Sequence, residues 1–172
     1  MAAVGSIGSV FLSVGMGLNA CPLCFYQRTF MFGILAVLAI ARLARGVFAP
    51  GAACLLASPL ALAGLVVAAF HVSLEARGIL ECPKGVLGLG SSPFQSLVAF
   101  VLLCAAVVPA AAIRSLTMSR RALVLIGSGA LGVMLGAASL VSAPPLPPPK
   151  NRPTVAEGYV LKACEPPPAP KR

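Results

Sequence analysis

Apolar residues occupy five long stretches of the chain, separated by short segments rich in polar residues, glycine or proline. A helix rises 1.5 Å per residue, so about 20 apolar residues are needed to cross the hydrocarbon core of a membrane. All five stretches come near this length, the second if its helix begins near Cys21. They cover residues 2–19, 29–43, 52–72, 94–113 and 122–141. The pattern predicts an all-α membrane protein with five transmembrane helices.

The composition agrees with a membrane location. Hydrophobic residues make up 59% of the 172 positions, charged residues only 10%, and the mean hydropathy is +0.97. One soluble domain could not bury that much apolar surface. The net charge of +9 comes from 13 basic residues scattered between the apolar stretches. Nucleic acid favours a contiguous basic face, so we expect no nucleic-acid partner.

Short basic loops predict the orientation in the membrane. Five arginines lie between the second and third and between the fourth and fifth stretches, and they mark the cytoplasmic side. They are Arg42, Arg45, Arg114, Arg120 and Arg121. The opposite side then holds the Cys21/Cys24 turn, the loop around Cys82 and the proline-rich tail, although Lys150 and Arg152 in that tail count against this orientation. With five spans, the two ends of the chain lie on opposite sides.

The six cysteines separate by their expected depth. Cys54 and Cys104 fall inside predicted helices, where a thiol behaves as a small hydrophobic group. The other four, Cys21, Cys24, Cys82 and Cys164, fall on the non-cytoplasmic side, where disulfides persist. We therefore expect two redox-active pairs or two structural bridges there.

The stretch "CPLCFYQR", residues 21–28, combines features that activate a thiol. Pro22 suits the first turn of a helix, so the cysteines lie at a helix N-terminus, where backbone N–H groups and the helix dipole stabilise a thiolate. Cys21, Cys24 and Arg28 follow i, i+3, i+7 spacing and share one helix face. The permanent cation lowers the pKa of the thiols further and is suited to hold a polar ligand head at the membrane boundary.

Three other interpretations of this pair stay open. A zinc site needs four ligands, and the single histidine, His71, would have to join from another helix, so we expect no metal. A lipoprotein signal ending at "LNAC" would lipidate Cys21, but no basic residue precedes Arg28. The third interpretation is an inert structural bridge, with Arg28 reaching toward the headgroups.

The motif resembles that of the DsbB family, membrane enzymes that use quinone to generate disulfides in periplasmic proteins. Two cysteines open the second membrane helix, an aromatic pair follows, and an arginine comes four residues after the second cysteine. The resemblance covers about residues 1–113 and implies a four-helix transmembrane bundle in the bacterial inner membrane. Residues 114–142 would then add a cytoplasmic turn and a fifth transmembrane helix, and residues 143–172 a periplasmic tail.

The resemblance also implies roles for individual residues. Cys24 matches the thiolate that faces the quinone, ubiquinone or menaquinone, and Cys21 matches the cysteine that exchanges with a second pair. Arg28 and His71 match residues beside the quinone, although a histidine at a membrane edge also packs against neighbouring helices without any such role. Cys82 matches a loop cysteine that exchanges with a DsbA-like, thioredoxin-fold periplasmic oxidase. The chain would then be an oxidoreductase that reoxidises this partner.

The loop around Cys82 departs from the family. Members typically keep two cysteines there, whereas this loop has one. A fifth span would return the tail, with its single Cys164, to the same side. We therefore predict a Cys82–Cys164 disulfide as the second redox pair.

A second enzyme class also combines a membrane C-x-x-C pair, a quinone and a second cysteine pair. This is the vitamin K epoxide reductase-like group. The arginine after the motif, and the position of the motif before most of the spans, favour the DsbB-like interpretation.

Overall fold

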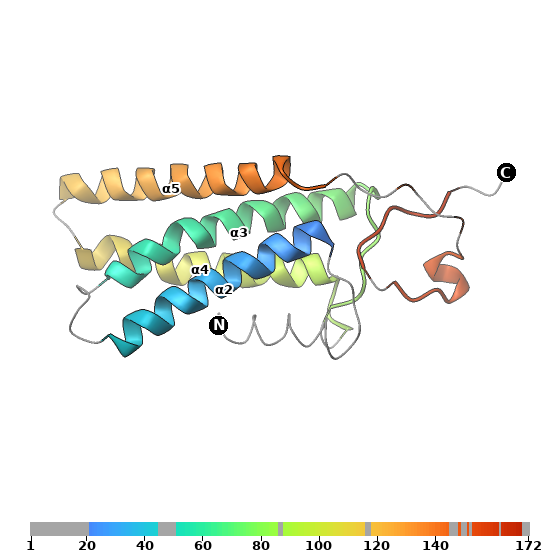
Figure 1. The fold of residues 1–172 in the computed structure, drawn as a ribbon, viewed down its shortest axis with the longest axis horizontal. Coiled ribbons are helices and arrows are strands. Elements are labelled where there is room, and N and C mark those ends of the chain that lie inside the picture. Colours follow the sequence, from blue (N-terminus) through green and yellow to red (C-terminus); the bar gives the residue numbers. More distant parts are fainter. Residues whose placement is uncertain are drawn as a thin grey trace.

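Four long helices run side by side along the molecule (Figure 1). They are α2 (Pro22–Leu43), α3 (Ala52–Ala76), α4 (Ser92–Ser115) and α5 (Met118–Val141). A short 3-10 helix, η3 (Val155–Glu157), lies in the tail beyond one end of the bundle. This computed structural model describes residues 21–44, 51–85, 88–115, 118–144, 148, 151, 153–161 and 163–169.

The helix predictions for the described part of the chain are confirmed. Helix α2 does begin beside Cys21, as the length of the second apolar stretch required, and α3 and α4 exceed the predicted stretches by a few residues at their ends. The three helices are long and apolar enough to cross a membrane. The predicted first span, residues 2–19, lies outside the described residues.

The fifth predicted span is a helix, but it is not shown to be a transmembrane helix. The apolar part of α5, Leu125–Val141, is shorter than the three candidate spans. Helix α5 nevertheless runs along α3 within the bundle (Figure 1). The fold is therefore all-α, with three long apolar helices and one shorter apolar helix among the described residues.

Helix α3 is the central helix of the bundle, because α2, α4 and α5 all pack mainly against it. On the α4 side, a Cβ at Gly64 would overlap the ring of Phe100, which is itself 1% exposed. Small residues at such positions allow membrane helices to approach closely. The core between α2, α3 and α4 is then completed by Met31, Ile34, Ala57, Ala61, Ala68, Phe100, Leu103 and Val107.

Glycines also bring α5 against α3. A Cβ at Gly132 would lie 2.6 Å from the Cβ of Leu62 and 2.9 Å from the carbonyl oxygen of Pro59. A Cβ at Gly136, one turn later, would lie 2.9 Å from the Cβ of Val66. This small-xxx-small pair is typical of close helix contacts in membranes. It holds the end of α5, from which the tail departs, beside the end of α3.

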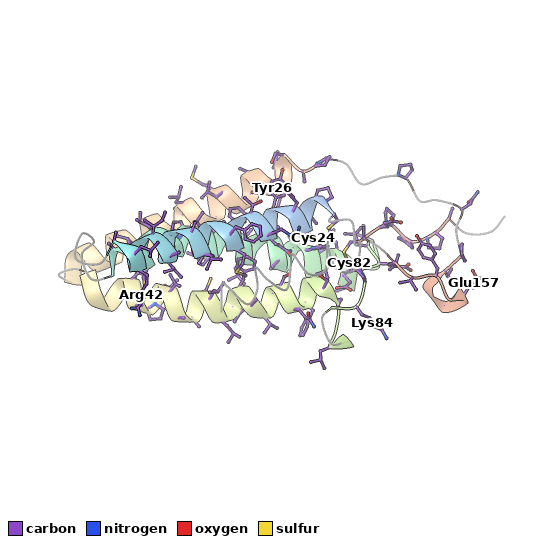
Figure 2. All side chains as sticks on the ribbon, turned by 60° about the horizontal axis from the view of Figure 1, so that its bottom comes forward. Cys24, Tyr26, Arg42, Cys82, Lys84 and Glu157 are labelled. Carbon is purple, nitrogen blue, oxygen red and sulfur yellow. A yellow bond between two sulfur atoms is a disulfide. The ribbon has the colours of Figure 1, made fainter. Side chains whose placement is uncertain are left out.

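The two ends of the bundle differ in chemistry. Cys24, Cys82 and Lys84 lie at the end from which the tail extends, and Arg42 lies toward the opposite end of α2 (Figure 2). The predicted orientation requires the cysteines and Arg42 to lie at opposite ends of the bundle, as they do.

We predict that Gly132→Ala destabilises the protein, whereas Gly129→Ala does not. A methyl group at Gly132 meets the backbone of α3, and overpacking of this kind costs about 1–3 kcal/mol. A Cβ at Gly129 meets no atom within 4 Å, so alanine there should be neutral or slightly stabilising through its helix propensity. Thermal unfolding in detergent micelles measures both. Equal midpoints for the two variants would contradict the proposed contact.

Candidate functional site: two cysteine pairs around a buried histidine

The first cysteine pair lies at the start of α2. Cys21 is the N-cap residue, and Pro22 occupies the first helical position, where its missing N–H leaves no hydrogen bond unmade. The Cys21 sulfur accepts a hydrogen bond from the backbone N–H of Cys24 at 3.3 Å. This cap folds the Cys21 side chain back over the first turn, so the two Sγ atoms lie 2.9 Å apart in hydrogen-bonding contact. Both cysteines are free thiols.

The surroundings of Cys21 favour its thiolate. The hydrogen bond with the Cys24 thiol is the largest influence and lowers the pKa of Cys21 to about 5, against the opposing effect of burial. The hydrogen bond from His71 and the backbone N–H of Cys24 lower this pKa further. A helix N-terminus stabilises a thiolate in the same way. Cys21 is therefore ionised at neutral pH.

The end of α3 sets the position of Cys82. Gly78 has φ +68°, and the N–H groups of Gly78 and Ile79 donate to the carbonyls of Glu75 (2.9 Å) and Leu74 (3.0 Å). These two bonds form a Schellman motif, which ends the helix and reverses the chain. The extended segment that follows buries Leu80, which is 2% exposed. Cys82, two residues later, points to the same side and reaches the end of α3.

The tail returns to this loop through a short antiparallel contact. The backbones of Glu81 and Glu165 exchange both hydrogen bonds, at 2.9 and 3.1 Å. In an antiparallel ladder the neighbouring residues, Cys82 and Cys164, face each other at a non-hydrogen-bonded position, where the Cα atoms come closest. Their Cα atoms are 4.2 Å apart, and their sulfurs form a disulfide. The predicted Cys82–Cys164 bridge is present in the structure, across a sequence separation of 82 residues.

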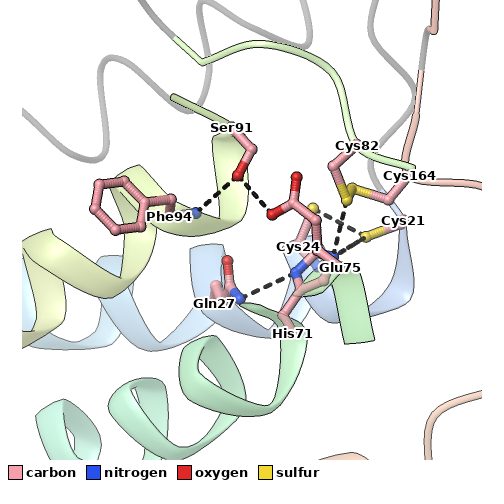
Figure 3. Close-up of a disulfide and its surroundings, with 9 residues drawn as sticks. All are labelled: Cys21, Cys24, Gln27, His71, Glu75, Cys82, Ser91, Phe94 and Cys164. Atoms are coloured by element: carbon pink, nitrogen blue, oxygen red, sulfur yellow. Dashed lines mark hydrogen bonds between the residues drawn. A yellow bond between two sulfur atoms is a disulfide. The ribbon is translucent and has the colours of Figure 1, made fainter. Parts of the chain in front are cut away.

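His71, in the last turns of α3, joins the two pairs (Figure 3). Its side chain is fully buried at 0% exposure. Its Nε2 atom lies 3.8 Å from the Sγ of Cys21 and 3.6 Å from the Sγ of Cys82. Its Nδ1 atom lies 3.3 Å from the Nε2 of Gln27 on α2. One imidazole therefore contacts a cysteine of each pair, and its two nitrogens face protein groups.

The loop that carries Cys82 is also fixed at its far end. The hydroxyl of Ser91 donates a hydrogen bond of 2.6 Å to Oε2 of Glu75 on α3 and accepts one of 3.4 Å from the backbone N–H of Phe94 (Figure 3). The second contact caps the start of α4. Glu75 and the Schellman motif thus anchor both ends of the loop to the same helix.

The structure separates the remaining candidate residues. Arg28 is half-buried one turn beyond Cys24 on α2, close enough for its charge to act on that sulfur. Cys54 and Cys104 are half-buried free thiols on α3 and α4, and both pack against the central core rather than in the sulfur cluster. The four cysteines expected on one side of the membrane therefore meet at one end of the bundle, together with His71.

A comparison with known protein families matches residues 1–138 to the family described as disulfide bond formation protein DsbB. The chain belongs to the DsbB family. The match continues beyond residue 113 into α5, so it includes most of the helix that the sequence argument set apart from the core. No curated protein and no solved structure matches the chain. Membership implies a multi-pass membrane oxidoreductase that acts in disulfide bond formation, in a family of the inner membrane.

The same residues include a set of potential metal ligands. One ligand atom each from Cys21, Cys24, His71 and Cys164 lies within 4.8 Å of the others. A zinc site would need His71 to come from another helix, and α3 does bring it to the Cys21/Cys24 pair. The sulfur of Cys164, however, is bonded to that of Cys82. The ligands that remain for a metal are two thiols and one imidazole. A structural zinc site needs four ligands, so the absence of a metal stays our prediction.

Gln27 is a site residue that the sequence reasoning missed. Its side chain is only 5% exposed, and it contacts the one histidine of the chain. The signal was available in this DsbB-family motif, because Gln27 follows Cys24 by three residues and a polar side chain on that helix face must find a partner when buried.

We predict that the alkylation rate of Cys21 rises with pH around a midpoint of about 5. Only the thiolate reacts, so a lowered pKa keeps Cys21 reactive in mildly acidic buffer. Cys24→Ala removes the largest cause and should move the midpoint upward, whereas Cys104→Ala should leave it unchanged. Iodoacetamide labelling followed by peptide mass spectrometry measures the rate. A midpoint near the ordinary thiol value of about 8.5 would contradict the assignment.

Proposed function

We propose that this DsbB-family protein reoxidises a periplasmic, thioredoxin-fold dithiol oxidase and passes the electrons to membrane quinone. The observation that carries this proposal is the contact of the Cys82–Cys164 disulfide with the Cys21/Cys24 pair around His71. Electrons would pass through two cysteine pairs in succession. The first is a disulfide that a soluble partner can reach, and the second is a thiol pair at the end of a membrane helix.

The first exchange takes place at Cys82. Cys164 is buried at 6% exposure, whereas Cys82 is half-buried, so Cys82 offers the more accessible sulfur. A partner thiolate attacks the Cys82 sulfur, the Cys82–Cys164 bond breaks, and Cys164 leaves as a thiolate. The Cys164 sulfur lies within 4.8 Å of both sulfurs of the first pair, and so only a small movement separates it from its next target.

The second exchange moves the electrons into the membrane helix. The Cys164 thiolate attacks Cys21 of an oxidised Cys21–Cys24 pair, and Cys24 leaves as a thiolate at the start of α2. The second thiol of the partner then displaces Cys82 and releases the oxidised partner. The Cys82 thiolate attacks Cys164, re-forms their disulfide and displaces Cys21 as a thiolate. The structure corresponds to the state after this step, with one disulfide and two free thiols.

The residues at the start of α2 fit a quinone. When bound, quinone accepts two electrons and two protons, which restores the Cys21–Cys24 disulfide. Cys24 lies in the first turn of a candidate membrane span, and Arg28, one turn further on, presents a cation suited to hold a polar quinone oxygen. Phe25, between them in sequence, is 59% exposed and offers an apolar surface beside the pair. The proposal gives His71 a place in this site as well, as the resemblance implied.

The orientation in the membrane is part of the proposal. We place the cysteine end of the bundle on the periplasmic side and the end near Arg42 in the cytoplasm. Helix α5 then crosses the membrane as a fifth, shorter span and returns the tail to the periplasm. This arrangement explains how a loop with one cysteine acquires a partner from the tail.

We predict that Cys24→Ala and Cys164→Ser each reduce quinone-dependent oxidation of the partner to the rate seen without the protein. Each change removes one sulfur of a required pair, so electrons cannot leave the partner by two-electron exchange. The assay uses purified protein in lipid, a quinone and a reduced thioredoxin-fold dithiol protein, followed by thiol labelling. Cys54→Ala is the matched control and should retain its activity. Undiminished oxidation by Cys24→Ala would refute the proposed function.

We predict that a partner with a single attacking cysteine is trapped on Cys82 and not on Cys164. The reason is that Cys82 is more exposed than Cys164. Non-reducing digestion and mass spectrometry identify the linked peptide. A mixed disulfide at Cys164 would reverse the proposed order of exchange.

A further inference from the structure

The ring of His71 has a defined hydrogen-bonding arrangement. It is the only histidine of the chain and is fully buried. The amide nitrogen of Gln27, at 3.3 Å from Nδ1, can only donate a hydrogen bond, so Nδ1 must accept it. In a neutral imidazole the proton then resides on Nε2. This N–H is directed at the sulfurs of Cys21 and Cys82, one from each redox pair (Figure 3).

We propose that Gln27 is a positioning residue that fixes the His71 tautomer, so that Nε2–H serves as one hydrogen-bond donor for thiolates at both Cys21 and Cys82. The inference deepens the proposed function and rests on it. None of the four cysteines could act as this fixed hydrogen-bond donor, because the bonding of each sulfur changes during the cycle.

The donor matches the step in which charge moves between the pairs. The Cys82 thiolate attacks Cys164 in a Cys21–Cys164 disulfide; the Cys82–Cys164 bond forms, the Cys21–Cys164 bond breaks, and the electron pair leaves on Cys21. The negative charge thus moves from Cys82 to Cys21, and no proton is consumed. Nε2 lies 3.6 Å from the first sulfur and 3.8 Å from the second, so the same N–H can follow the charge. Donors fixed in advance toward a developing charge lower the barrier to its formation.

The packing leaves Gln27 as the side chain that contacts Nδ1 of His71. Gln27, 5% exposed, is on the face of α2 that meets α3, and its position three residues after Cys24 couples it to the motif. Among the described residues, the Cys21 thiol contacts the ring, the Cys24 sulfur lies within 4.8 Å of it, and Glu75 follows one turn along α3. Glu75 accepts the hydrogen bond from Ser91. Gln27 is thus the group that decides which ring nitrogen carries the proton.

The single histidine makes the tautomer measurable without partner or quinone. In protein labelled with ¹⁵N-histidine, with the Cys82–Cys164 disulfide intact and the first pair reduced, NMR should show Nε2 protonated and Nδ1 unprotonated. In Gln27→Glu, the carboxylate accepts a hydrogen bond and should place a proton on Nδ1. Tyr26→Phe, on the same helix turn but hydrogen-bonded to Ser142, is the control and should leave the spectrum unchanged. A protonated Nδ1 in the unmodified protein, or an unprotonated Nδ1 in Gln27→Glu, would overturn the proposal.

The consequence for exchange is tested in a second variant. Gln27→Met keeps the side-chain length without the donor, so the tautomer is no longer fixed. We expect electron transfer from the Cys82/Cys164 dithiol to the Cys21–Cys24 disulfide to slow at least ten-fold in a single turnover. Attack of the partner on Cys82, in which Cys164 is the leaving group, should change less than two-fold. Exchange as fast as in Tyr26→Phe would refute the positioning role. Equal loss of both steps would instead indicate failure of the site as a whole, and would refute it as well.

Discussion

Two backbone hydrogen bonds between Glu81 and Glu165 hold the tail against the loop after α3, and the thiol chemistry depends on them. They place Cys82 and Cys164 opposite each other at the position of an antiparallel ladder where side chains approach most closely. In the proposed exchange, the same contact must persist when the disulfide opens. Two hydrogen bonds are weak by themselves, so the buried side chain of Leu80, which belongs to the same hydrophobic cluster as Cys164, contributes to keeping the segments together.

Helix α3 is the element on which both segments converge. A glycine on α3 lets α4 approach it, and two glycines on α5 let that helix approach it. The Schellman motif at the end of α3 directs the loop back over His71. The tail starts where α5 ends, beside that same helix end. One helix therefore supplies the histidine, the start of the loop and the surface for α5, and both cysteine pairs lie at its end.

In this site, hydrogen-bond donors stabilise a thiolate in a buried environment of low polarity. Burial alone would keep the thiols neutral. The pKa of Cys21 is nevertheless lowered, because a thiol, a backbone N–H at a helix N-terminus and an imidazole all donate hydrogen bonds to its sulfur. The imidazole contacts the second pair as well, at the sulfur of Cys82. Cys54 and Cys104 are free thiols that pack against the hydrophobic core of the described helices.

The sequence by itself determined the helices and the nature of the first pair. The lengths of the apolar stretches defined α2, α3 and α4, and Pro22 between two cysteines placed the thiols at a helix start, because both features act within a few residues of the chain. Gln27 carried a local signal, a polar side chain near the cysteines on α2, but its partner His71 lies on another helix.

Only the tertiary structure decided which groups meet. The alignment of Cys82 with Cys164 follows from two hydrogen bonds between segments more than 80 residues apart, and the sequence offered a reason for that pairing but no geometry. The position of His71 between both pairs depends on the packing of α2 against α3, which composition does not encode. Local periodicity determines secondary structure, whereas the contact of distant sulfurs requires that the whole bundle be assembled.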